Sequence, residues 1–299
     1  MSRKNGILSL VVFAVCFSGL NLTLRYGGMN SIPSLVLVVG GLLGGSLVGL
    51  MPFSMHISIH GWPELKKNYL FELGVVVVTA SAIPFWLQAE GLSRTTASKA
   101  GIIFSLIPVL TTVLSRIMLE RKATRSLWIR IATMVGGGIL ISWEGTQATV
   151  NTGDLMIFGA TFSFALSNVF AYRLLQNWPI HALIQARLFL GGCLLVPLLF
   201  YTNSLQFEYT GGLFWLIPLI SFLFIGVFYG VYYGLIALGP ELATLFDIIS
   251  ALLTVVAAFF LFDETLMLHQ LIGGGLIVLT AGHLVRNIWL KKEKLVKTA

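Results

Sequence analysis

Two side chains of opposite charge interrupt long apolar stretches of this sequence, and they are the first candidates for chemistry. Arg187 and Asp247 each lie within a run of mostly hydrophobic residues. A charge at the middle of a membrane helix costs roughly 2.5–3.5 kcal/mol on the insertion scale, so it must pair, line a water-filled cavity or reach the interface. We predict that the two pair with each other or with a solute, on the inner half of a path between helices.

An asparagine recurs at the same helical spacing in two distant stretches. Asn21 follows Phe17 by four residues. Asn168 follows Phe164 by four as well, and its helical face continues to Tyr172. A carboxamide inside a bilayer needs a hydrogen-bonding partner, which is either a neighbouring helix or a solute. The spacing does not decide between these two roles.

The third apolar stretch carries a polar stripe made by Thr79, Trp86 and Glu90. An indole face and a carboxylate on one side of a helix suit an amine or a zwitterion, through cation–π contact and charge. Glu90 also suits an interfacial position near the outer end of the helix, so both roles stay open.

Hydroxyl groups complete the candidate set. Tyr229 and Tyr232 lie in an aromatic run, where the buried hydroxyls need partners that a wet cavity supplies, although such runs also occur as simple core packing. Ser105 gives the stretch before Pro108 a modest polar face. The candidate substrate-binding residues are Asn21, Thr79, Trp86, Glu90, Ser105, Asn168, Tyr172, Tyr229 and Tyr232, with Arg187 and Asp247 as a charged pair.

Motifs for catalysis, metal binding or nucleic-acid binding are not found. The sequence contains no HExxH, no GxSxG and no phosphate-binding loop. His56 and His60 are four residues apart with no third ligand in view, which favours solvated histidines over a metal site. The basic residues behind the net charge of +7 lie between apolar runs and at the C-terminal end, where they do not form a nucleic-acid surface. We therefore expect no enzyme activity, no cofactor and no metal.

Membrane helices are the elements that must position these residues. The chain has 299 residues, of which 57% are hydrophobic and only 10% charged, whereas a soluble domain carries about 25% charged residues. Apolar runs of about 20 residues recur, and each is long enough to cross a bilayer as a helix. The sequence predicts an all-α polytopic membrane protein with ten transmembrane helices, at 6–24, 32–51, 69–92, 97–119, 126–143, 154–175, 180–201, 213–238, 242–262 and 266–289.

The distribution of basic residues predicts the orientation. With the N-terminus inside, most of the 19 lysines and arginines lie in inner segments and few in outer loops. This predicts cytoplasmic N- and C-termini in a bacterial-type inner membrane.

The sequence also predicts that the chain is two similar halves. The apolar stretch 99–121 returns at 243–264, with Glu264 falling on Glu120. Because five spans per half is an odd number, the second half must lie inverted relative to the first. We place the halves at 1–145 and 146–299. Inverted repeats are a transporter architecture, with a site between the halves near the middle of the membrane.

These patterns resemble the drug/metabolite transporter superfamily, and in particular its EamA-like branch of ten-helix carriers. The resemblance covers essentially the whole chain and is carried by IMLERKATRSLWI at 117–129, three glycines at 136–138, GDLMIFGATFSFALSNVFAYRLL at 153–175 and FLFDETLMLHQLIGGGLIVLTAG at 260–282. The family often has an arginine in both the second and the seventh span. Here the seventh keeps Arg187, whereas the second reads VVGGLL.

The resemblance implies a secondary transporter of small organic solutes that works by alternating access and exports amino acids or related metabolites. Glu90 and Asp247 are the candidates for proton coupling, which nothing in the sequence requires. A carrier of lipophilic drugs or nucleotide sugars, and a membrane-embedded sensor or enzyme, are the alternatives. The expected partners are a small-molecule solute and the lipid bilayer, and the sequence leaves a monomer and a homodimer both open.

Overall fold

The described part of the chain is helical throughout. The computed structural model describes residues 3–61, 67–118, 125–142, 151–205, 213–263 and 267–297, and these ranges contain helices and no strands. The predicted all-α class is confirmed. Glu120 and Glu264, which set the register of the predicted repeat, lie outside the described residues.

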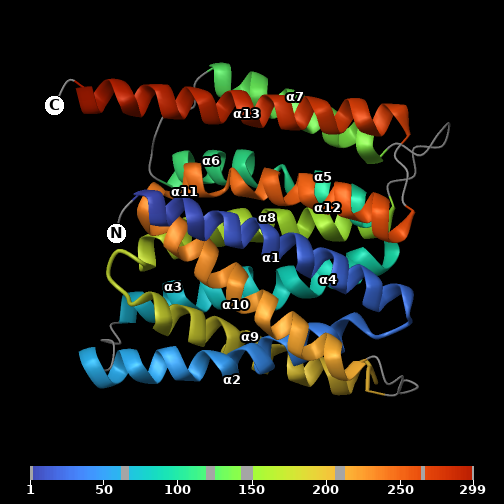
Figure 1. Cartoon of the computed structure of the whole chain (residues 1–299), viewed down its shortest axis with the longest axis vertical. Coiled ribbons are helices and arrows are strands. Elements are labelled where there is room, and N and C mark those ends of the chain that lie inside the picture. Colours follow the sequence, from blue (N-terminus) through green and yellow to red (C-terminus); the bar gives the residue numbers. More distant parts are fainter. Residues whose placement is uncertain are drawn as a thin grey trace.

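Helices follow one another with short connections (Figure 1). Up to residue 142 they are α1 (Arg3–Met29), α2 (Ser34–His60), α3 (Lys67–Val77), the π-helical turn η1 (Val78–Ala82), α4 (Ile83–Arg94), α5 (Ala97–Phe104), α6 (Ile107–Met118) and α7 (Arg125–Ser142). After residue 151 they are α8 (Thr152–Leu174), α9 (Ile180–Tyr201), α10 (Leu213–Leu238), α11 (Pro240–Ala243), α12 (Phe246–Phe262) and α13 (Leu268–Lys297).

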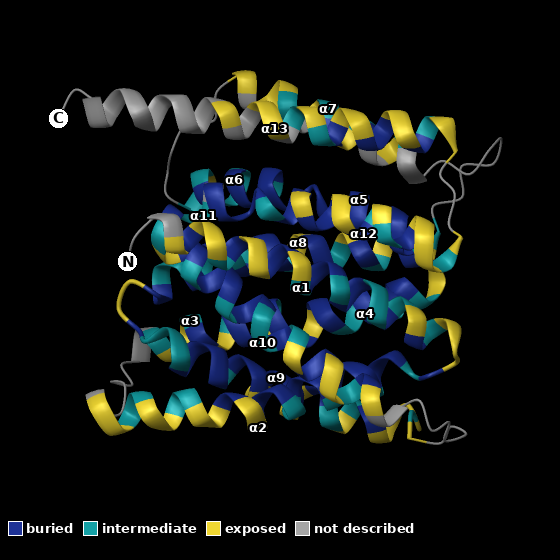
Figure 2. Cartoon of the chain, in the orientation of Figure 1, coloured by how far each residue is buried: buried dark blue, intermediate teal, exposed yellow. Residues whose placement is uncertain are grey.

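Seven stretches of the described chain are long and apolar enough to cross a membrane, and α12 and the first part of α13 are shorter apolar helices. Large hydrophobic side chains are exposed along the outer faces, among them Leu8, Val15, Phe260 and Leu279. Figure 2 shows buried residues gathered in the central helices, with exposed residues on α2 and α13. A bilayer would cover such apolar faces, so the protein is a multi-pass membrane protein.

Two predicted spans are broken helices rather than continuous ones, which corrects the sequence interpretation. The fourth span divides into α5 and α6 because Pro108 has no N–H to donate to the carbonyl of Phe104 and its ring crowds that carbonyl. The ninth divides into α11 and α12 at Thr244, whose hydroxyl donates to the carbonyl of Pro240 at 2.9 Å. Broken helices of this kind frame substrate sites in transporters.

The third span contains a π-helical turn that the sequence did not predict. In α-helical geometry the residue at position 84 would donate its N–H to the carbonyl of Ala80, but Pro84 has none. The turn η1 ends just before this proline, so the carbonyl of Ala80 is left for another donor. This carbonyl becomes part of the site described below.

Helices that precede residue 142 pack against helices that follow residue 151. Helix α1 packs against α10 and α12, α4 against α8, and α2 against α9 and α10. Helices α7 and α13 lie side by side at one edge (Figure 1). The helix α1 begins, and α13 ends, on one side of the molecule, which we call the terminal side, whereas α8 begins on the opposite side (Figure 1).

Candidate functional site

A small cavity lies where α1, α4, α6, α8, α9, α10 and α12 meet. Its space is about 30 Å³, whereas sites for drug-sized ligands measure roughly 300–1,000 Å³. In this conformation the cavity is therefore too small for such a ligand. Its wall is largely aromatic, formed by Phe13, Phe17, Phe85, Phe164 and Phe228, and its polar side chains are Ser167, Asn168, Arg187 and Asp247.

Arg187 is the cationic group of this cavity, and neutral acceptors hold it. It is 4% exposed, and its Nε donates to Ser81 Oγ at 3.0 Å. One Nη donates to the hydroxyl of Tyr232, and the other donates to the carbonyl of Ala80 that Pro84 leaves free. The rigid fork of a guanidinium suits several acceptors in fixed directions.

Two aromatic rings and a glycine complete the binding environment of the Arg187 side chain. The guanidinium carbon lies 3.9 Å from the centroid of the Phe228 ring and 5.1 Å from that of Tyr232, within cation–π range. Gly191 lets α9 approach η1, because a Cβ atom there would lie 2.6 Å from the Cβ of Ser81. The sequence thus encodes the position of Arg187 through Pro84, Ser81 and Gly191.

Asp247 is the anionic group of the cavity, and one of its oxygens has no partner. The residue is 4% exposed, lies in the first turn of α12, and its buried Oδ2 has no hydrogen-bond partner. Arg187 and Asp247 line the same cavity. The guanidinium of Arg187 is directed to Ser81, Tyr232 and Ala80 and not to Asp247. Of the two predicted partners of this pair, each other or a solute, the structure leaves the solute open.

The two asparagines occupy different environments. Asn168 lines the cavity. Asn21 is 1% exposed and accepts a hydrogen bond of 2.7 Å from Nε2 of Gln88, which joins α1 to α4. The phenylalanines that precede them meet directly, since the rings of Phe17 and Phe164 lie edge to face with centroids 5.8 Å apart.

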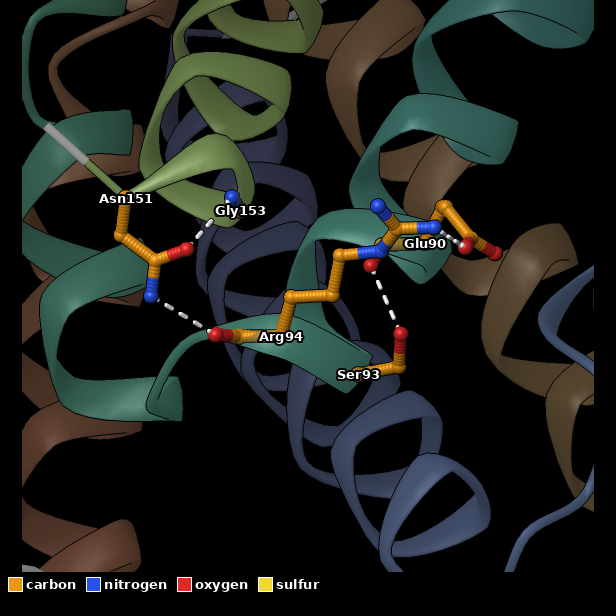
Figure 3. A network of polar contacts seen from close by, with 5 residues as sticks. All are labelled: Glu90, Ser93, Arg94, Asn151 and Gly153. Carbon is orange, nitrogen blue, oxygen red and sulfur yellow. Dashed lines mark hydrogen bonds and ion pairs between the residues drawn. The ribbon is translucent and has the colours of Figure 1, made fainter.

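Glu90 lies near the end of α4 in a network of polar contacts (Figure 3). It is not among the residues that line the cavity. Its carboxylate pairs with Arg94 at 2.5 Å, and its backbone carbonyl accepts from the hydroxyl of Ser93 at 2.7 Å. The carbonyl of Arg94 accepts from Asn151 at 2.9 Å, and the Asn151 side chain also caps α8 by accepting from the N–H of Gly153. This network ties α4 to the start of α8.

The other predicted site residues do not line the cavity. Thr79 donates to the carbonyl of Val75 at 2.7 Å, and Ser105 donates to that of Ile102 at 2.6 Å. Tyr229 lies 2.9 Å from Nδ1 of His181. Trp86 and Tyr172 are partly buried against the hydrophobic core. Tyr232 acts one step behind the cavity, through its bond to Arg187.

Ser81, Phe85 and Gln88 are site or support residues that the sequence reasoning missed. Each lies within four residues of Pro84. A proline four residues after a membrane-embedded carbonyl indicates that this carbonyl lacks its helical donor. Arg187 was a candidate donor for it, because a guanidinium in a membrane needs acceptors. The signal for the Ala80 carbonyl was therefore present, whereas the same argument gives none for Ser81.

Comparisons with known proteins agree with this architecture. The model of the EamA-like transporter family matches residues 4–143 and 151–285. An uncharacterized transporter of Archaeoglobus fulgidus is 26% identical over 286 residues, covering 94% of this chain and 97% of the relative. The uncharacterized transporter YyaM of Bacillus subtilis is 25% identical over 148 residues, so the match spans about half of each chain, 47% and 48%.

A crystal structure of another protein shares the fold, with a TM-score of 0.68 at 13% identity over 96% of this chain and 99% of the other. At this identity the likeness concerns the fold alone. The family model covers most of the chain in two consecutive matches. The chain therefore belongs to the EamA-like transporter family, and it is a membrane transporter rather than an enzyme.

Proposed function

We propose that the protein is a secondary transporter that moves small organic solutes across the inner membrane by alternating access, exporting amino acids or related metabolites. The observation that carries this proposal is the cavity itself. It brings one guanidinium, one carboxylate and one carboxamide, those of Arg187, Asp247 and Asn168, to an aromatic wall among helices from both parts of the chain. A dipolar solute with an apolar side chain has complementary chemistry.

We propose further that ten spans form two inverted halves, 1–145 and 146–299, with both termini in the cytoplasm. The two consecutive family matches and the opposite starting sides of α1 and α8 support this arrangement (Figure 1). Packing supports it as well, because in two contacts a glycine of one half closely approaches a serine of the other half. Gly191 meets Ser81 between α9 and η1, and Gly44 meets Ser221 between α2 and α10.

Closure at both ends fits an occluded step of the transport cycle. On the side opposite the termini, a Cβ on Gly91 would lie 3.0 Å from the carbonyl of Gly153, so α4 and α8 are in close contact. On the terminal side, a Cβ on Gly6 would overlap the Cβ of Ala237, so α1 and α10 are equally close. We expect opening to either side to separate one of these contacts.

The site favours amino acids over nucleotide sugars. A nucleotide sugar carries two phosphates, which several cationic side chains would have to neutralise. Among the residues that line the cavity in the described chain, Arg187 is the one cation, and Asp247 would repel phosphate. The carboxylate and the guanidinium together match a zwitterion.

Counterflow tests the function directly. Purified protein in liposomes is preloaded with one unlabelled amino acid, and uptake of the same labelled amino acid is followed across the proteinogenic set. We expect counterflow with at least one of them, and its loss in Arg187→Met. Protein that is monodisperse and melts cooperatively, yet exchanges no amino acid, would contradict the proposal. Tags at both termini that are accessible only from the periplasm would contradict the orientation.

A further inference from the structure

Asp247 is a buried acid whose hydrogen-bonding capacity is not satisfied by the protein groups around it. One carboxyl oxygen has no hydrogen-bond partner, the residue is 4% exposed, and the adjoining cavity wall is mostly aromatic. An ionised oxygen in such a place is unfavourable, because no protein donor compensates the hydration lost in a small, largely aromatic cavity. In a cavity of this size and lining the geometry fits a protonated acid.

The neighbouring charges do not change this conclusion. Arg187 shares the cavity, and its guanidinium binds neutral acceptors, although an ionised carboxylate across so small a space would attract it strongly. Helices α1, α5 and α11 pack against α12. Among the described side chains of α1 and α5, the titratable or charged groups are Cys16, Arg25, Tyr26 and Lys99, and none of them lines the cavity.

The structure also separates Asp247 from the other candidate acid. Glu90 is paired with Arg94 at the end of α4 and does not line the cavity. A group that couples proton movement to solute movement must be reachable by both, and must have no permanent partner. Of the two acids, Asp247 meets both conditions.

We propose that Asp247 is the coupling residue, which carries a proton when the cavity is empty and exchanges it for the ammonium group of an amine-bearing substrate. This inference rests on the proposed function. On the cytoplasmic side the O–H bond of the acid breaks, the proton passes to water, and the carboxylate pairs with the ammonium. On the outer side the ammonium leaves and a proton from the outer water binds in its place.

Proton movement and substrate movement are linked because a proton and an ammonium group cannot occupy the carboxylate of Asp247 at the same time. A bare carboxylate strongly disfavours closure of the aromatic cavity, so the protein closes with either a proton or an ammonium on Asp247. The first turn of α12, where the helix dipole favours negative charge, keeps the ionised form accessible while substrate binds. One proton therefore enters for each substrate molecule that leaves.

Chemical labelling tests the protonation without knowledge of the substrate. Dicyclohexylcarbodiimide, an apolar reagent, modifies protonated carboxyl groups in membranes, and mass spectrometry locates the adduct in the full-length protein. We expect labelling of Asp247 that decreases several-fold as the pH rises, and several-fold protection by amino acids that show counterflow. Unlabelled Asp247 in folded protein at acidic pH would overturn the proposal.

Transport driven by an imposed pH difference tests the coupling. In liposomes loaded with labelled amino acid, acid outside and neutral inside should accelerate efflux of the wild type several-fold. Asp247→Glu should keep this acceleration with a shifted pH profile, and Asp247→Asn should lose it. Glu72→Gln, which removes a partly buried carboxylate of α3 outside the cavity lining, is the matched control and should behave as the wild type.

The outcomes separate the two proposals. Counterflow that is equally fast with and without the pH difference, in wild type and Asp247→Asn alike, would overturn the coupling and leave the transporter standing. Absence of counterflow with every amino acid would overturn the proposed function and, with it, the coupling that depends on it.

Discussion

The guanidinium of Arg187 fits its site in a way that no other cation could. Pro84 leaves the carbonyl of Ala80 without a helical donor, and Arg187 supplies one from the other part of the chain. Ser81 receives a second N–H, and the ring of Phe228 lies under the guanidinium plane. A lysine ammonium is a point charge that cannot meet these directions at once. Arg187 is thereby fixed as a permanent positive charge at the cavity wall.

Arg187→Lys should therefore abolish counterflow although the charge is kept. Each lost charged hydrogen bond costs about 1.5–3 kcal/mol, so the melting temperature in detergent should fall as well. Ser81→Ala should lower both quantities less, since it removes one bond. Ser58→Ala, at an exposed serine bonded to its own helix, is the control. Wild-type transport in Arg187→Lys would show that charge alone suffices.

The amide pair Asn21–Gln88 should prove to be a tie between helices rather than a substrate contact. Each amide keeps one buried atom without a partner, Asn21 Nδ2 and Gln88 Oε1. Asn21→Leu alone or Gln88→Met alone should lower the unfolding free energy by roughly 1–3 kcal/mol, because it strands the other amide. The double variant should recover most of the loss and transport normally. A double variant that is stable but inactive would assign the pair to substrate binding.

At the scale of elements, close approach of helices decides the geometry of the site. Gly191 brings α9 against η1, which in turn places Ser81 under Arg187. Gly44 makes a similar approach between α2 and α10, but the atom it meets there is the hydroxyl of Ser221, at the end of its side chain. The two contacts look alike. At Gly191, however, the nearest atom is the Cβ of Ser81, which cannot rotate away and belongs to a residue of the site.

Gly191→Ala should accordingly be more damaging than Gly44→Ala. An extra methyl group in a packed interface costs about 1–3 kcal/mol, and at Gly191 the displaced atom is the Cβ of Ser81, so Arg187 loses its position too. Gly74→Ala, where a Cβ would meet nothing within 4 Å, is the control and should be as stable as the wild type or more so. Melting temperature and counterflow rate are the measurements. Equal effects at Gly44 and Gly191 would contradict this view of the α9–η1 contact.

At the scale of the whole molecule, hydropathy predicted the seven stretches of the described chain that are long and apolar enough to cross a membrane, because span length is fixed by the bilayer. It could not predict where a helix is interrupted. The breaks after Phe104 and Ala243 leave the apolar pattern intact, and the first of them depends on a single proline, Pro108. Asn168, Arg187 and Asp247 were found from sequence because polar groups in lipid are costly wherever they point.

The predicted residues that do not line the cavity show the limit of that reasoning. Glu90 is as polar as Asp247, but it lies beside Arg94, one helical turn away on the same face. Spacing along one helix identifies which side chains share a face. Which helix that face meets is decided by packing over the whole fold, and this had no signal in the sequence.

Alternating access makes a prediction about the contact between α4 and α8, which must separate if the side opposite the termini opens. Thr95 donates to Asp154 there at 2.6 Å, and both residues are buried. A Thr95→Cys/Asp154→Cys protein, with Cys16 and Cys193 replaced by serine, should lose counterflow on oxidation and regain it with dithiothreitol. Each single cysteine protein should be insensitive to oxidation. If the disulfide forms and transport continues, substrates do not leave between these two helices, and the passage opens elsewhere in the molecule.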